Sequence, residues 1–104
     1  MTGKPVAPRE QARRDVEEAI RYYATEASET IALGFVDALE AAYGLIANHP
    51  QSGSQRYAHE LSLPDLRSRA LQRYPYIVFY VEGPDAIDIW RVLQAQRDIP
   101  SMVG

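Results

Sequence analysis

The chain has 104 residues, of which 46% are hydrophobic and 24% are charged. This length is enough for one hydrophobic core, so it predicts a single domain over residues 1–104. The formal net charge of −3 argues against broad attraction to nucleic acid, and the absence of cysteine excludes disulfides and thiolate metal sites. There is no apolar run near the roughly 20 residues that cross a bilayer, and no secretory signal at the N-terminus. These features predict a soluble cytoplasmic protein that does not act at a membrane.

The first half of the sequence predicts an edge strand followed by two helices. The stretch KPVAP is too rich in proline for a central strand but suits an edge strand. Apolar residues at spacings of three and four predict an amphipathic helix over residues 9–27. Ser28 is suited to cap a second helix, and Pro50 ends it, so the two helices must form a hairpin. The acidic residues of the first helix are expected on a solvated face: Asp15, Glu17 and Glu18.

The second half predicts a surface connector followed by three strands. Residues 48–66 are mostly polar and contain proline and glycine, which is typical of a connector. Beyond them the side-chain period changes to two, and residues 76–81 are apolar on both faces. EGPD then predicts a turn, and residues 86–93 a returning strand. The expected fold is α+β, with the edge strand and helical hairpin packed on one face of an antiparallel three-stranded meander.

The cations of the second half are the least ordinary feature of the sequence. All six basic residues of positions 51–104 are arginines, a side chain suited to binding carboxylate or phosphate through two parallel hydrogen bonds. Four of them are expected to converge on the sheet face that the helices leave open, with tyrosines between them: Arg67, Arg69, Arg73 and Arg91, with Tyr74, Tyr76 or Tyr80. The alternative is that they cover apolar surface and pair with acidic residues: Asp65, Asp88 or Asp98.

The register of Arg91 is left open by the sequence. Strict alternation puts Arg91 in step with Ile87 and Ile89, on an apolar face, unless a β-bulge shifts the pairing. His49 and His59 lie in the connector without a carboxylate at helical spacing, and no cluster of residues has metal-ligand spacing. The sequence therefore predicts neither a metal nor another cofactor.

Several motifs together resemble the ParE branch of the RelE/ParE toxin superfamily. They are a Pro-x-x-Gly after the second helix (Pro50 to Gly53), Arg67 at the start of a strand, YPY with FY behind it (Tyr74 to Tyr80), and the closing RVL…RD (Arg91 to Asp98). The resemblance covers about residues 8–100 and implies the toxin of a type II toxin–antitoxin pair. It implies a ParD-like antitoxin as partner and DNA gyrase as target, without sequence-specific binding of nucleic acid by the toxin alone. The residues then expected to bind partners are Arg67, Arg69, Arg73, Tyr76, Tyr80, Arg91 and Arg97.

The same superfamily contains ribosome-dependent mRNA endonucleases of the RelE type, which need cations together with acid and base side chains. Where many relatives have a histidine shortly after RVL, this chain has Gln94, whose amide cannot exchange a proton near neutral pH. The second half also contains no lysine. We therefore expect an inhibitor that acts by binding and has no catalytic residues. An mRNA endonuclease and a degenerate, non-toxic relative are the alternatives.

Overall fold

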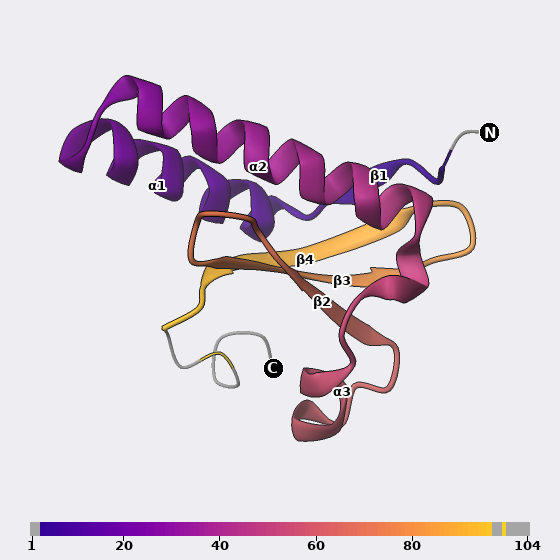
Figure 1. Cartoon of the computed structure of the whole chain (residues 1–104). Helices are drawn as coiled ribbons and strands as arrows, with labels where there is room; N and C mark the ends of the chain where they lie inside the picture. The colour runs from indigo at the N-terminus through magenta and orange to yellow at the C-terminus, as the bar shows by residue number, and fades with distance from the viewer. Residues whose placement is uncertain (1–2, 97–98, 100–104) are drawn as a thin grey trace.

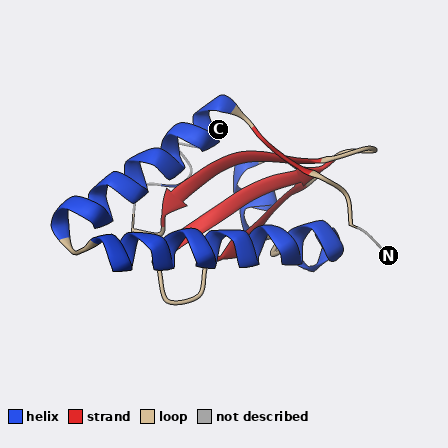
Figure 2. Ribbon diagram, turned by 90° about the horizontal axis from the view of Figure 1, so that it is seen from above, coloured by secondary structure: helices blue, strands red, loops and turns tan. Residues whose placement is uncertain are grey.

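The computed structural model describes residues 3–96 and Ile99, and it confirms the α+β fold. The elements in chain order are β1 (Val6–Pro8), α1 (Glu10–Glu26), α2 (Glu29–Asn48), the 3-10 turn η1 (Pro50–Ser52), α3 (Arg56–Leu61), β2 (Leu66–Ala70), β3 (Tyr76–Glu82) and β4 (Ile87–Gln94). The hairpin of α1 and α2 covers one face of the sheet, and α3 lies on its other side (Figure 1). Seen from above, the two helices meet at one end and diverge, with the strands visible between them (Figure 2).

The sheet has four strands in the order β1-β4-β3-β2. Strands β2, β3 and β4 form the expected antiparallel meander, and β1 pairs in parallel with β4 at the edge. The pairing of β1 covers only Ile87 to Ile89, because the chain then turns into α1, and Arg9 N–H donates to the carbonyl oxygen of Ile89 at 2.9 Å. The C-terminal half of β4 therefore has no strand on its outer side in the part of the chain that the structure describes.

Local signals in the sequence explain the helical hairpin and its core. The predicted cap of α2 is confirmed, since Ser28 Oγ accepts a hydrogen bond from the N–H of Ile31 at 3.1 Å. The main core lies between the hairpin and the sheet and includes Phe35, Leu39 and Ile46 from α2 together with Val78, Tyr80 and Ile89 from the strands. Helical and strand periods thus direct both sets of apolar side chains into one layer.

The opposite face of the sheet is also covered. A second core contains Leu66, Phe79, Leu93 and Ile99, with Tyr57 of α3 and Trp90 packed against it. The segment between α2 and β2, predicted as an ordered connector over the surface, contains this short helix. The ring of Tyr57 on α3 stands 5.2 Å from that of Phe79. The prediction of a sheet face left open for arginines is therefore wrong, because β3 is apolar on both sides and both sides are packed.

Helix α2 is unusually apolar on its outer surface. By length and composition alone it could cross a membrane, although Phe35, Leu39 and Ile46 are core residues beneath it. Ile31, Leu33 and Leu45 are 41%, 59% and 46% exposed, respectively. Leu33 is two residues from Ile31 and so points to a different side of the helix, and isolated apolar side chains on a surface are ordinary.

Candidate functional site

Arg67 and Tyr80 together hold the turn that follows α2. They lie opposite each other in the β2–β3 register. Arg67 Nη1 donates to the carbonyl oxygens of Gln51 and Gly53 at 2.9 and 3.0 Å, and the hydroxyl of Tyr80 donates to the carbonyl of Pro50 at 2.7 Å. Tyr80 is fully buried, so the prediction that it lies on a partner-binding surface is wrong. Burial also raises the pKa of this phenol.

Gly53 shows why the Pro-x-x-Gly motif has a glycine. Its backbone is extended, with φ −69° and ψ 155°, so no unusual torsion requires glycine there. The reason is close approach, because a Cβ at this position would overlap the hydroxyl of Tyr80 and stand 2.9 Å from the ring carbon that carries it. The proline begins a 3-10 turn, and the glycine admits the tyrosine that fastens the turn to β3.

Arg91 forms the most buried ion pair among the described residues. Its Nε and Nη2 donate to Oδ2 and Oδ1 of Asp15 at 2.8 and 2.9 Å, and the backbone N–H of Val92 donates to Oδ2 at 3.0 Å. The side chains of Asp15 and Arg91 are 6% and 18% exposed, respectively. Donation of hydrogen bonds to the Asp15 carboxylate raises the pKa of Arg91 above its ordinary value. The prediction of Asp15 on a solvated face is wrong. Of the acidic partners that the alternative offered to the arginines as a group, Asp88 pairs with Arg9, and Asp98 is outside the described residues.

A β-bulge resolves the register of Arg91. Phe79 pairs with Arg91, whereas the next residue, Tyr80, pairs with Ile89, so Trp90 is the extra residue. Ile87, Ile89 and Val92 all belong to the core beneath the hairpin, and Arg91 falls out of step with them. The bulge thus lets Arg91 reach Asp15 on α1 at the edge of the sheet.

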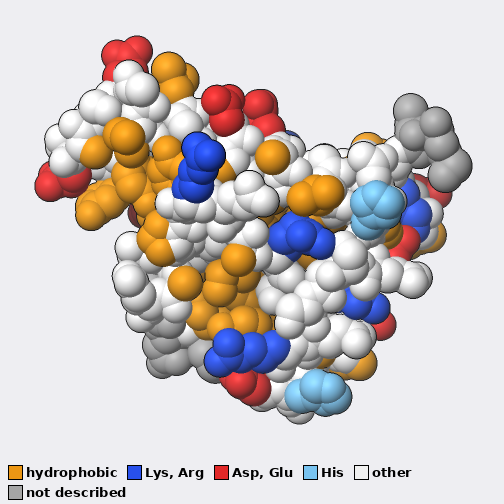
Figure 3. Space-filling view, viewed as in Figure 1, with side chains coloured by type: hydrophobic (Ala, Val, Ile, Leu, Met, Phe, Trp, Pro, Cys, Tyr) orange, Lys and Arg blue, Asp and Glu red, His pale blue; other side chains and the backbone are white. Residues whose placement is uncertain are grey.

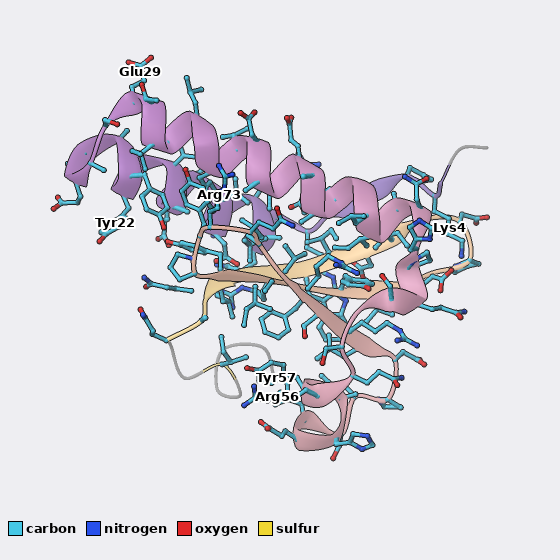
Figure 4. All side chains as sticks on the ribbon, viewed as in Figure 1. Lys4, Tyr22, Glu29, Arg56, Tyr57 and Arg73 are labelled. Carbon is cyan, nitrogen blue, oxygen red and sulfur yellow. The ribbon has the colours of Figure 1, made fainter. Side chains whose placement is uncertain are left out.

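Arg69 and Arg73 border a groove between α2 and the outer edge of β2, which we call the α2–β2 groove. It has a volume of about 440 Å³, and α2 contributes a mostly apolar wall that includes Gly34, Ala38, Ala41 and Leu45, together with one carboxylate, Asp37. Arg69 donates to the hydroxyl of Ser52, while its Nε is buried without a hydrogen-bond partner. Arg73 is exposed in the β2–β3 loop in a left-handed conformation, φ 70° (Figure 4). In the described part of the chain neither arginine has a carboxylate within ion-pair distance.

Hydrophobic side chains gather on the face where the hairpin meets the strands, with Lys and Arg side chains among them (Figure 3). Between the hairpin and the sheet, four aromatic rings form a group with edge-to-face contacts: Tyr23, Phe35, Tyr74 and Tyr76. Tyr74 also donates its hydroxyl to the carbonyl oxygen of Ile31 at 2.9 Å. This group fixes the tip of the hairpin on the sheet.

Comparison with known proteins places the chain in a family. Residues 6–99 match the family described as the ParE toxin of the type II toxin–antitoxin system, parDE. The chain belongs to the ParE toxin family. A solved structure described as the chromosomal ParDE TA system from P. aeruginosa has a similar fold, with a TM-score of 0.75, 17% sequence identity, and coverage of 89% of this chain and 97% of that one. Among curated proteins the sequence has no match.

In this ParE-family chain the predicted arginines do not converge. Arg67 and Arg69 lie opposite Tyr80 and Val78 and so share the sheet face that packs against the hairpin. Arg91 lies two strands away at the other edge of the sheet, and Arg97 is outside the described residues. The structure thus groups Arg69 with Arg73 and keeps Arg91 apart.

The apolar wall of the groove was missed from the sequence, although a signal for it exists in α2. Ile31, Gly34, Ala38, Ala41 and Leu45 recur at spacings of three and four, beside the core stripe of the same helix. Two adjacent apolar stripes on one helix indicate two contacts, one with the sheet and one with a further element.

Two of the predicted arginines of this ParE-family toxin, Arg67 and Arg91, are engaged in contacts within the chain. The described residues contain no group of three or more His, Cys, Asp or Glu that could hold a metal ion. Arg67 is held by backbone carbonyls, and Arg91 by a carboxylate that already accepts three hydrogen bonds. Gln94, half-buried, is the last residue of β4. It lines a cleft between α1 and the end of β4 to which Arg91 also contributes.

Proposed function

We propose that this ParE-family toxin inhibits DNA gyrase in the cytoplasm by binding to it, and that a ParD-like antitoxin neutralises it. The observation that carries the binding mechanism is the engagement of Arg67 and Arg91 in structural contacts. A ribonuclease needs cations free to stabilise the charge on a phosphate and side chains that move protons. Here the two candidate cations are occupied, and Gln94 supplies no proton at neutral pH.

The first test compares the two candidate targets. We expect the purified toxin to inhibit supercoiling of relaxed plasmid by gyrase and to leave ribosome-bound mRNA intact. Both assays use the same preparation, and the toxin with excess antitoxin is the control for each. Codon-spaced cleavage of mRNA with unchanged supercoiling would support the RelE-like alternative, and inactivity in both would support a degenerate relative.

The antitoxin is proposed to bind the α2–β2 groove. Antitoxin tails are flexible segments that order on binding, and an apolar groove bordered by cations suits a segment with apolar anchors and carboxylates. The groove offers the α2 wall, apolar except for Asp37, on one side and two arginines on the other, Arg69 and Arg73, which form no ion pair with a carboxylate of the described residues. Ala70, at the open edge of β2, is exposed beside them.

Replacing Arg73 with alanine should weaken antitoxin binding by about 1–3 kcal/mol, the value of a hydrogen bond to a charged group, which is roughly 5- to 150-fold in Kd. The folded state should be unaffected, because Arg73 is exposed and has no ion-pair partner among the described residues. Titration calorimetry with the antitoxin measures the change, and thermal unfolding checks the fold. Arg14→Ala is the matched control, since Arg14 is an exposed arginine on α1 that pairs only with Glu10. Equal affinities for the two variants would exclude Arg73 from the antitoxin site.

A further inference from the structure

Beyond the end of β1, the outer edge of β4 has no neighbouring strand in the described chain. The N–H of Ile87 points toward β1 and donates to the carbonyl oxygen of Pro5. The β-bulge further along β4 then shifts by one residue which backbone groups point outward. Val92 N–H points outward to Asp15, whereas Ala95 N–H points inward to the carbonyl of Pro75. Because backbone groups alternate along a strand, the N–H and C=O of Gln94 and the C=O of Val92 point outward. No strand of the described chain pairs with them.

A cleft of about 390 Å³ runs along this open edge. One wall is α1, which presents side chains from successive turns: Gln11, Asp15, Glu18 and Tyr22. The other wall is the end of β4 with Tyr76. Tyr22 is 53% exposed and projects from the tip region of α1 (Figure 4). The cleft therefore combines unpaired backbone groups, an acidic helix wall and two aromatic rings.

The charges of the cleft are unbalanced. It contains the carboxylates of Asp15 and Glu18 against the single guanidinium of Arg91, which Asp15 already neutralises. Glu18 is exposed and makes no ion pair among the described residues, and its charge adds to the rise in the pKa of Arg91. The remaining negative charge is complementary to a cation, and an exposed tyrosine beside it suits a guanidinium or ammonium group through a cation–π contact.

We propose that the end of β4 is a strand-addition site for an extended segment of a partner protein that carries an arginine or lysine. The segment pairs with the outward backbone groups of Val92 and Gln94, and its basic side chain lies between Glu18 and Tyr22. Asp15 occupies the N–H of Val92 and so limits this edge to a short pairing, which protects the free protein from edge-to-edge association. This site lies at the opposite edge of the sheet from the α2–β2 groove, and it binds a basic segment where the groove is proposed to bind an acidic one. It therefore goes beyond the proposed function.

The test uses the full-length chain labelled with ¹⁵N and three seven-residue peptides of alternating threonine and valine. One has a central arginine, one a central glutamate, and the third is the arginine peptide with its outward amides N-methylated. We expect the arginine peptide to shift the amide signal of Gln94 and to bind at least about tenfold tighter than the glutamate peptide, as one charge-assisted contact allows. The N-methylated peptide should not bind, because it cannot pair with the strand.

Substitutions on α1 make the test specific. Glu18→Gln should remove the preference for arginine, whereas Glu17→Gln should keep it, because Glu17 is an exposed carboxylate on the same helix that does not line the cleft. Equal affinity for the arginine and glutamate peptides, signal changes at Ala70 in place of Gln94, or no binding of any peptide at millimolar concentration would each overturn the proposal. Failure of gyrase inhibition would leave these outcomes unchanged.

Discussion

Replacing Arg91 with alanine should lower the free energy of unfolding by about 3 kcal/mol, the lower end of the cost of breaking a buried ion pair. The substitution leaves the Asp15 carboxylate, 6% exposed, without its cation, while the N–H of Val92 still donates to it. We take the lower end because the Arg91 side chain is 18% exposed and water can partly replace it. Denaturant titration followed by the fluorescence of Trp90, the single tryptophan, measures the change.

Arg14→Ala is the control, because its ion pair with Glu10 is exposed and should contribute less than about 0.5 kcal/mol. A double variant separates charge burial from packing. Asp15→Leu combined with Arg91→Met removes both charges together and should recover part of the loss, but not all of it, because the N–H of Val92 then lacks its acceptor. If Arg91→Ala unfolds at the same denaturant concentration as Arg14→Ala, the pair does not support the fold, and a role of Arg91 in binding a partner is favoured instead.

Periodicity predicted the elements of this fold but not the depth of individual polar residues. Asp15 illustrates the limit, because it was assigned to a solvated face with Glu17 and Glu18. It lies three residues after Ala12 and four before Ala19, both buried, so its position on the apolar face of α1 was readable from the spacing. The need for a carboxylate there was not readable, since it arises from the early end of β1, which leaves Val92 N–H without a strand partner.

The strands also show which features periodicity predicts and which it does not. Alternation correctly grouped Arg67 with Arg69, and the sequence raised the possibility of a bulge at Arg91. The face that the arginines occupy depends on what packs against each side of the sheet. The side away from the hairpin is covered by α3, a six-residue helix within a polar connector. Short helices carry little periodic signal, and their contacts are tertiary. The apolar wall of the α2–β2 groove has a signal in the spacing of α2, but the groove itself could not be predicted, because it forms only where α2 passes over the edge of β2.

A substitution that adds one methyl group tests why the Pro-x-x-Gly motif ends in glycine. Gly53→Ala should lower the free energy of unfolding by about 2–3 kcal/mol, through overpacking of a rigid site and loss of the Tyr80 hydrogen bond to Pro50. Tyr80 cannot move away easily, because it is fully buried in the main core. Chemical denaturation of the variant measures the cost.

Gly44→Ala is the matched control, since Gly44 lies in α2 and an added Cβ meets no atom within 4 Å. This change should raise the free energy of unfolding by about 0.5–1 kcal/mol, because alanine loses less conformational freedom than glycine in a helix. Adding Tyr80→Phe to Gly53→Ala removes the clashing hydroxyl and should relieve part of the strain, but not all, because the ring carbon still lies 2.9 Å from the new Cβ. If Gly53→Ala and Gly44→Ala change stability in the same direction, close approach of Tyr80 does not explain the glycine, and its requirement must come from a partner that contacts the turn.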